Sequence, residues 1–328
     1  MNKPYQSVYA AHLADFIHLK QKLGFSYKTE TVILAQLDRL AAKRGETTPG
    51  ITEGLAVEWG QKRPHESAQY HHGRIRQLLG FSAYLCELGI ASHLPRLPRW
   101  VASTFIPYIY SQAEIQALFT ACDNLRLSPR SIGAGACLMS MPALLRLLYG
   151  TGLRISEALA LKNEQVHLEA NYLQVKDSKN KQERLLPISD SLVVVLREYV
   201  HYREHLPVKK PSGYFFVKLN GRPCGGNSIR CWFKKCLYQA AIASGVKHGP
   251  RIHDLRHTFA VTALATMAEA GMDLYVSLPV LSCYLGHQTL ESTNHYVRLV
   301  ASMYPDLIRQ VDTLCLDVFP KPCCHETD

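Results

Sequence analysis

The prolines at positions 95, 98 and 107 interrupt a chain that otherwise shows the spacing of successive helices. Proline fixes φ, removes a backbone donor and disfavours helix in the residue before it. A segment this rich in proline is therefore expected to be extended. Because 328 residues exceed one typical domain, we predict an N-terminal domain over residues 1–93, a linker over 94–110 and a second domain over 111–328.

The residues before the linker show the apolar spacing of four helices. Gly24 is placed to end the first helix, Thr29 to cap the second, Thr52 the third, and Ser67 the fourth, which ends before Gly89. The early turns of the fourth helix carry side chains suited to contacts with phosphates and base edges in a nucleic acid groove. A solvated polar face explains the same pattern equally well. The side chains are those of Tyr70, His72, Arg74 and Arg76.

The second domain is predicted to combine helices with one hairpin. Residues 172–176 alternate as a strand, and residues 184–188 are its antiparallel partner. Ser111 is placed to cap the first helix of this domain. Further helices are predicted over residues 143–149, 191–205, 227–243 and 304–316. The predicted fold class is therefore mainly α with a small antiparallel β element.

The sequence H-D-L-R-H-T-F-A at residues 253–260 carries a pattern with chemical meaning. From its second residue onward it is expected to be helical, so His253 and Arg256 emerge on one face, three residues apart. A guanidinium group matches the oxygens of a phosphate or carboxylate, which predicts an anion site. A solvated edge or a structural ion pair is the alternative. The helix is predicted to bury Leu255, Phe259, Thr262 and Ala263 along one stripe.

Four further motifs accompany this segment in a fixed order. They are T-G-L-R-I-S-E at 151–157, K-x-K-x-x-R-L-L-P at 179–187, L-G-H at 285–287, and a tyrosine nine positions beyond that histidine. With these motifs the chain resembles the tyrosine recombinase, or phage integrase, family. The resemblance covers the C-terminal two thirds and, more weakly, the N-terminal region. It implies an N-terminal four-helix (SAM-like) core-binding domain that clamps DNA and a C-terminal α+β tyrosine recombinase catalytic domain.

The resemblance also implies a set of catalytic residues. Two arginines clamp the scissile phosphate, two histidines donate hydrogen bonds and assist proton movement, a lysine protonates the leaving 5′ oxygen, and a tyrosine forms a 3′-phosphotyrosyl bond. The matching residues are Arg154, Arg256, His253, His287, Lys179 and Tyr296. Family members have glycines beside the lysine, where this chain has Ser178 and Asn180, and Lys181 is the alternative. Tyr284 and Tyr304 are the alternative nucleophiles, and only the interval of nine residues from His287 selects Tyr296.

The net charge of +10 favours a polyanionic partner, nucleic acid before an anionic membrane surface. The resemblance to the family makes double-stranded DNA the expected partner. Basic side chains in the linker and in the predicted helix 227–243 are candidate DNA contacts, namely Arg96, Arg99, Arg230 and Lys234. By analogy with the family we expect a homo-oligomer, a tetramer on two synapsed sites, and accessory DNA-binding proteins as further partners. The apolar stripe of residues 304–316 is a candidate for packing onto an adjacent protomer.

The ten cysteines are scattered without a C-x-x-C pair, which favours free thiols in a reducing compartment over zinc or disulfides. No apolar run reaches membrane-spanning length. We therefore expect a cytoplasmic, nucleoid-associated protein that does not interact with a membrane. The Gly150–Gly152 segment lacks the third glycine and preceding strand of a dinucleotide fingerprint, so no cofactor is expected.

These observations predict a site-specific DNA recombinase that cleaves and rejoins DNA during integration, excision or transposition of a mobile element. The predicted site offers cations and donors, which suit a phosphoryl transition state better than metal-assisted hydrolysis. One alternative is a metal-dependent nuclease that uses Asp177 with Glu164 or Glu169. Another is a catalytically inactive DNA-binding protein of the same fold. A relative of type IB topoisomerases shares the chemistry but does not require a defined site.

Overall fold

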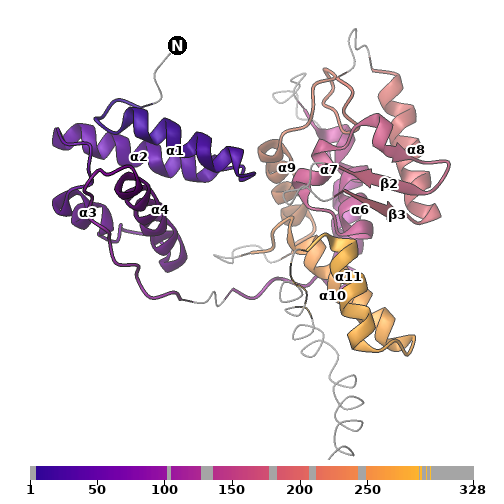
Figure 1. Cartoon of the computed structure of the whole chain (residues 1–328). Coiled ribbons are helices and arrows are strands. Elements are labelled where there is room, and N and C mark those ends of the chain that lie inside the picture. Colours follow the sequence, from indigo (N-terminus) through magenta and orange to yellow (C-terminus); the bar gives the residue numbers. More distant parts are fainter. Residues whose placement is uncertain are drawn as a thin grey trace, which may run out of the picture. The chain divides into compact units, whose positions relative to one another are not determined.

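The computed structural model describes residues 5–101, 105–126, 136–176, 183–206, 212–242 and 249–287, and the single positions 289, 293 and 296. The chain divides into two compact units, Met1–Phe105 and Ile106–Asp328 (Figure 1). The division falls within the proline-rich segment over 94–110. Within the described residues the fold is mostly helical with one small antiparallel sheet, as the sequence predicts.

The described part of the first unit contains four helices: α1 (Ala10–Lys22), α2 (Lys28–Arg44), α3 (Glu53–Gly60) and α4 (Ala68–Glu87). Their inward sides form one core, in which Leu13, Leu37, Leu55, Leu78 and Phe81 are fully buried. The predicted caps of α3 and α4 are confirmed. The Thr52 and Ser67 side chains accept hydrogen bonds from the backbone N–H groups of Leu55 and Tyr70.

The predicted start of the second helix is wrong. α2 begins at Lys28, one residue before the expected Thr29 cap, and Tyr27 precedes it in the left-handed region at φ 48°. Tertiary contacts hold Tyr27 there, because its hydroxyl donates to Gln77 Oε1 at 2.7 Å and its ring packs on Phe16 with 5.9 Å between centroids. These contacts outweigh the local preference for a threonine cap.

Arg74 is a correction to the predicted DNA contacts, because its side chain is fully buried inside the first unit. Its Nε and Nη2 atoms donate to the two oxygens of Glu66 at 2.8 and 3.0 Å, and Nη2 also donates to Gln61 O at 2.9 Å. Nη1 donates to Trp59 O, and the guanidinium lies 4.9 Å from the Trp59 ring centroid. Arg74 therefore ties α3 to α4 and has no route to DNA.

The other polar residues of α4 remain at the surface. Tyr70 and Arg76 are exposed, while His72 is partly buried with its ring edge-on to Trp100, at 5.0 Å between centroids. The linker residues Arg96 and Arg99 are also exposed.

α6 (Met141–Thr151) is the central helix of the second unit, and its Leu144, Leu145 and Leu147 are fully buried. α6 packs against α5 (Gln112–Asp123), α8 (Asp190–Glu204) and α10 (Asp254–Glu269). The remaining helices in its described part are α7 (Ile155–Ala160), α9 (Gly226–Gln239), α11 (Leu274–Leu285) and the short 3-10 helices at Leu138–Ser140 and Asn163–Gln165.

The sheet described in the second unit has three antiparallel strands in the order β1 (Val166–His167), β2 (Tyr172–Val175) and β3 (Arg184–Pro187). The predicted hairpin is β2 and β3, with Leu173 opposite Leu186 and Val175 opposite Arg184. β1 was not predicted, because two residues are too few to show an alternating pattern. The turn with Lys179 and Lys181 lies outside the described residues, as does the predicted helix 304–316.

The buried stripe predicted for α10 is partly wrong. Leu255 is fully buried, but Thr262 is exposed, and the deeper residues of this helix are Ala260, Val261 and Leu264. α10 is contacted by both α6 and α11, so its buried surface is wider than one stripe. α10 and α11 lie side by side in Figure 1. A third apolar cluster joins these two helices to Tyr296 through residues such as Val261, Leu281 and Leu285.

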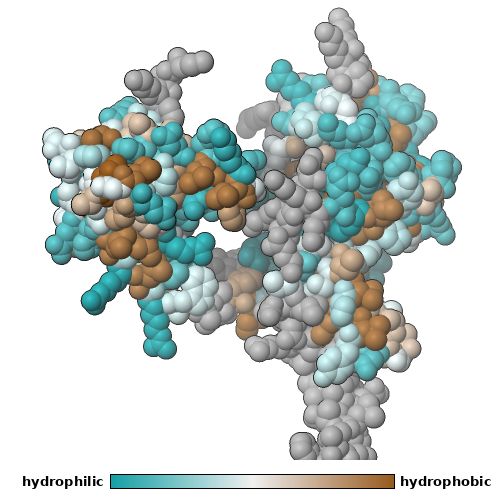
Figure 2. All heavy atoms as spheres, in the orientation of Figure 1, coloured by the Kyte–Doolittle hydropathy of each residue, from teal (hydrophilic) through white to brown (hydrophobic). Residues whose placement is uncertain are grey.

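Figure 2 shows hydrophobic residues at the α10–α11 end of the second unit, where Met272, Val276 and Val280 are exposed. Within the described residues, no helix is both long enough and apolar enough to cross a membrane.

Replacing Arg74 with alanine is expected to destabilise the first unit by about 3 kcal/mol, because the change leaves a buried carboxylate without its partner. The Arg74 guanidinium holds the pKa of Glu66 at about 2, so this carboxylate is charged at neutral pH. The exposed neighbour Arg76 provides the control, and Arg76→Ala should change the unfolding free energy by no more than about 0.5 kcal/mol. Urea unfolding of the full chain measures both. An unchanged urea midpoint for Arg74→Ala, with weaker DNA binding, would contradict this assignment.

Candidate active site

Two left-handed glycines frame the candidate site. Gly152 ends α6 at φ 60°, and Gly286 ends α11 at φ 67°. A Cβ atom on Gly152 would lie 2.5 Å from Cδ1 of Phe259, so a larger residue does not fit. These turns bring the T-G-L-R and L-G-H motifs, which are far apart in sequence, next to α10. Arg154 and His287 directly follow the two turns.

Arg256 connects the two turns from the first turns of α10. Its Nη1 donates to Gly152 O at 2.7 Å, and its Nη2 donates to Leu285 O at 2.8 Å. Its side chain is almost fully buried. Burial, followed by the positive charge of Arg154, lowers the pKa of Arg256 to about 10. The guanidinium is therefore still charged at neutral pH, but its charge is destabilised.

Arg154 lies at the edge of the same site, immediately before α7. Its Nη1 donates to Glu157 Oε1 at 2.8 Å, and its Nη2 contacts Gly286 O at 3.4 Å. The side chain is 21% exposed, so Arg154 is less buried than Arg256.

Glu157 and Arg184 complete a brace that the sequence analysis did not identify as part of the site. Arg184, at the start of β3, donates from Nη2 to Glu157 Oε2 at 3.0 Å and from Nε to Tyr284 O at 2.9 Å. A Cβ atom on Gly286 would lie 2.8 Å from Arg184 Nη1, so the guanidinium packs directly on the glycine turn. Burial tends to raise the pKa of Glu157, but Arg184 and Arg154 outweigh it and lower that pKa.

The sequence contained a signal for this brace. Glu157 stands three residues after Arg154, a spacing at which side chains meet on a helix. Its pairing with Arg184 joins two motifs that are far apart in sequence, and no local pattern reveals such a contact.

His287 is held between Arg256 and Thr293. Its Nε2 lies 2.9 Å from Arg256 Nη2, and its Nδ1 lies 2.8 Å from Thr293 Oγ1. Because arginine only donates, Nε2 accepts, and the proton of the neutral ring is on Nδ1. Burial and then the charges of Arg256 and Arg154 lower the pKa of His287 to about 4. His287 is therefore neutral at physiological pH.

His253 directly precedes α10 and has a similar environment. Burial, then the charges of Arg256 and Arg251, lower its pKa to about 4. Its ring lies 4.8 Å from the ring of His257, in an edge-on arrangement. Both predicted site histidines are thus neutral near pH 7, because they are partly buried beside arginines.

Tyr296 is buried among α10 and α11 and faces the same cluster. Its ring stacks on His287 with 6.1 Å between centroids, and its hydroxyl lies 3.2 Å from His257 Nδ1. Burial raises the pKa of the Tyr296 phenol, while the charge and hydrogen bond of Arg256 and the charge of Arg154 act in the opposite direction. The described site therefore brings together neutral histidines, one phenol and three guanidinium groups, those of Arg154, Arg184 and Arg256.

Residues 110–303 match the phage integrase family. The chain belongs to this family. Tyrosine recombinase XerC of Chlamydia caviae is 32% identical over 69% of this chain and 66% of its own, and XerD of Listeria innocua is 30% identical over 76% of each. The y4rB protein of Sinorhizobium fredii, named as a candidate integrase/recombinase, is 28% identical over 93% of this chain and 98% of its own. The chain is thus a tyrosine site-specific recombinase.

Solved structures share the fold at low sequence identity. XerH recombinase in a post-cleavage complex with a palindromic difH substrate has a TM-score of 0.63 at 18% identity, covering 85% of this chain and 78% of that one. The integrase of transposon Tn1549 in complex with transposon right end DNA has a TM-score of 0.61 at 16% identity, covering 92% of this chain and all of that one.

The described residues among the other predictions lie outside this cluster. Arg230 and Lys234 are exposed on α9, where Arg230 Nη1 donates to Asn227 Oδ1 at 2.9 Å. Lys179, like Asp177 of the nuclease alternative, lies outside the described residues. Glu164 and Glu169 are exposed. Among the residues that the structure describes, no three His, Cys, Asp or Glu side chains are grouped to hold a metal ion.

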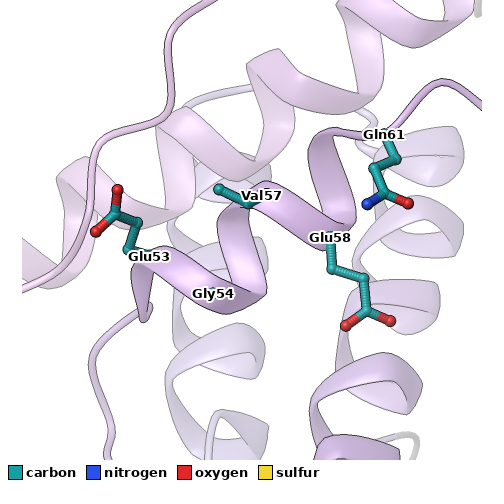
Figure 3. Close-up of a pocket in the computed structure, with 5 residues that line it drawn as sticks. All are labelled: Glu53, Gly54, Val57, Glu58 and Gln61. Carbon is teal, nitrogen blue, oxygen red and sulfur yellow. The ribbon is translucent and has the colours of Figure 1, made fainter.

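A surface depression on α3 lies in the first unit and contains none of the predicted catalytic residues. It is lined by Glu53, Gly54, Val57, Glu58 and Gln61, and the two carboxylates point in different directions (Figure 3). Glu58 forms an ion pair with Arg44. An acidic lining is unfavourable for phosphate, so this depression is not a second DNA site.

Replacing Arg184 with lysine tests the brace, because an ammonium group cannot contact Tyr284 O and both Glu157 oxygens in the geometry of a guanidinium. The rate of DNA cleavage by this recombinase should fall on the order of tenfold to a hundredfold through misplaced site groups, with DNA affinity retained. Arg197→Lys is the matched control, because Arg197 pairs with Glu169 at the surface. Single-turnover cleavage of a nicked substrate measures both rates. Equal rates for the two variants would show that the brace has no part in cleavage.

Proposed function

We propose that this recombinase cleaves and rejoins DNA through a 3′-phosphotyrosyl intermediate on Tyr296. The observation that carries the proposal is the position of the Tyr296 phenol beside the buried, charged guanidinium of Arg256. A nucleophile and a cation that stabilises phosphate oxygens are both required for this reaction, and here they are neighbours.

Arg154 and Arg256 are proposed to bind the non-bridging oxygens of the scissile phosphate. Their charges are close enough for Arg154 to lower the pKa of Arg256. A dianionic transition state between them would relieve this repulsion and gain charge-assisted hydrogen bonds. The partly exposed edge of Arg154 supports access for the phosphate from solvent. The pKa of both His253 and His287 is about 4, so both are proposed to assist as neutral rings. His253 is proposed to contact the phosphate, and His287 to act through its contact with Arg256.

Lys179 is proposed as the general acid that protonates the departing 5′ oxygen. Support comes from sequence order: this lysine stands between the segments of β2 and β3, shortly before Arg184, and Arg184 is anchored to Glu157 in the site. Covalent capture of the phosphate on Tyr296 conserves the energy of the broken bond, so rejoining requires no ATP.

The proposed substrate is double-stranded DNA held by both units of the chain. The net charge of +10 supports this partner. Solved relatives of the same fold were captured with DNA, which also supports it. Because Arg74 is buried, it is excluded from the predicted DNA contacts. The proposed contacts are Tyr70, His72, Arg76, Arg96, Arg99, Arg230 and Lys234.

Strand exchange joins two duplexes, so we infer a homotetramer on synapsed sites, with accessory DNA-binding proteins as additional partners. The proposed biological reaction is integration, excision or transposition of a mobile element. This activity would place the protein in the cytoplasm on the nucleoid.

Tyr296→Phe should bind the recombination site with unchanged affinity and form no covalent adduct on a nicked suicide substrate, because the nucleophilic oxygen is absent. The matched control is Tyr284→Phe. The Tyr284 hydroxyl contacts Pro187 O at 3.4 Å, and its loss should leave the adduct yield near that of the unchanged enzyme. Denaturing gel electrophoresis of the protein–DNA complex measures both. A normal adduct yield from Tyr296→Phe would refute the assignment.

A further inference from the structure

A second histidine of α10 contacts the Tyr296 hydroxyl and has no role in the mechanism described so far. His257 Nδ1 lies 3.2 Å from Tyr296 Oη, and the two rings are 5.6 Å apart. We propose that His257 is the general base that accepts the phenol proton when Tyr296 attacks the phosphate. This inference rests on the proposed function, because it concerns the activation of the same nucleophile.

The contact has the geometry that proton transfer requires. A general base must lie within hydrogen-bonding reach of the proton it removes, and 3.2 Å meets that condition before any substrate tightens the site. The His257 side chain is only 13% exposed, so bulk water has little access to it. His287 stacks on the same phenol ring, but its two nitrogens are engaged with Arg256 and Thr293.

Asp254 supplies the third member of the arrangement. Its Oδ1 lies 4.0 Å from His257 Nε2, on the side of the imidazole away from the phenol. Asp254 is buried and fixed in place, because Arg251 donates to it from its backbone N–H at 2.7 Å and from Nη2 at 2.9 Å. A carboxylate near Nε2 favours the tautomer that has its proton there, which puts the acceptor lone pair of the ring on Nδ1, the nitrogen near the phenol. It would also stabilise the imidazolium that forms.

The roles on the two sides of the phenol oxygen are different. Arg256 cannot take a proton, but its hydrogen bond and charge favour the phenolate. In the cleavage step the Tyr296 Oη–phosphorus bond forms, the bond from phosphorus to the 5′ oxygen breaks, and the phenol proton moves to His257 Nδ1. The departing 5′ oxygen receives a proton from the general acid. In the rejoining step a 5′ hydroxyl attacks the phosphorus and gives its proton to the group that served as general acid. The phosphotyrosyl bond breaks, and His257 returns its proton to the Tyr296 oxygen.

The test combines His257→Asn with a nucleophile that needs no base. Asparagine keeps an acceptor near the position of Nδ1 but cannot take up a proton at neutral pH. Its cleavage rate on a nicked substrate should fall on the order of a hundredfold, with DNA affinity unchanged. When Tyr296 is replaced by trifluorotyrosine, whose phenol is largely ionised at neutral pH, the loss caused by His257→Asn should shrink to a few fold.

His253→Gln is the matched comparison in both backgrounds. Because His253 is assigned to the phosphate, His253→Gln should reduce the cleavage rate by the same factor with tyrosine and with trifluorotyrosine at position 296. The proposal is overturned if the His257→Asn loss is equally large in both backgrounds, or if only the His253→Gln loss is relieved. Should His257→Asn fail to fold, as judged by circular dichroism, His257→Gln takes its place with the same expectations.

Adduct formation by the unchanged enzyme tests the proposed function separately from the role of His257. An adduct that disappears in Tyr296→Phe supports the function whatever His257 does. If the unchanged chain forms no adduct on its site, the proposed function fails and the role of His257 fails with it.

Discussion

The candidate site depends on the hydrogen bonds from the buried Arg256 guanidinium to Gly152 O and Leu285 O. A guanidinium taken out of water is unfavourable unless acceptors surround it, and two carbonyls and one imidazole nitrogen do so here. The same bonds draw the ends of α6 and α11 onto α10. Arg154 and His287 follow those ends directly, so one buried cation positions the other members of the cluster.

The charge balance of the cluster explains why it suits a phosphate. Among its described members, Arg154, Arg184 and Arg256 are positive, and Glu157 accepts from the first two. Glu157 thereby fixes two guanidinium groups in place while neutralising only one charge. The excess positive charge lies beside the Tyr296 phenol. Neutral histidines add donors and acceptors to the cluster without adding to the repulsion between the arginines.

Much of the fold followed from sequence because it rests on local patterns, whereas the set of candidate site residues was implied by the resemblance to the family. Ser67 and Thr52 cap their helices through contacts three residues away, and the hairpin strands alternate in the usual way. The features that were missed or misassigned are set by tertiary contacts. The sequence pattern predicted Arg74 as a surface cation. In the structure its guanidinium contacts Glu66 and two backbone carbonyls at the C-terminal end of α3. The His257–Tyr296 contact spans 39 residues, and nothing local predicts it.

The central claim is that Tyr296, set beside Arg256, is the nucleophile. Its most direct test is to trap the covalent protein–DNA complex, digest both components, and identify by mass spectrometry the tyrosine that carries the nucleotide. The account predicts a 3′-linked nucleotide on the peptide that contains Tyr296. A nucleotide on Tyr284, Tyr304 or any other residue would contradict it.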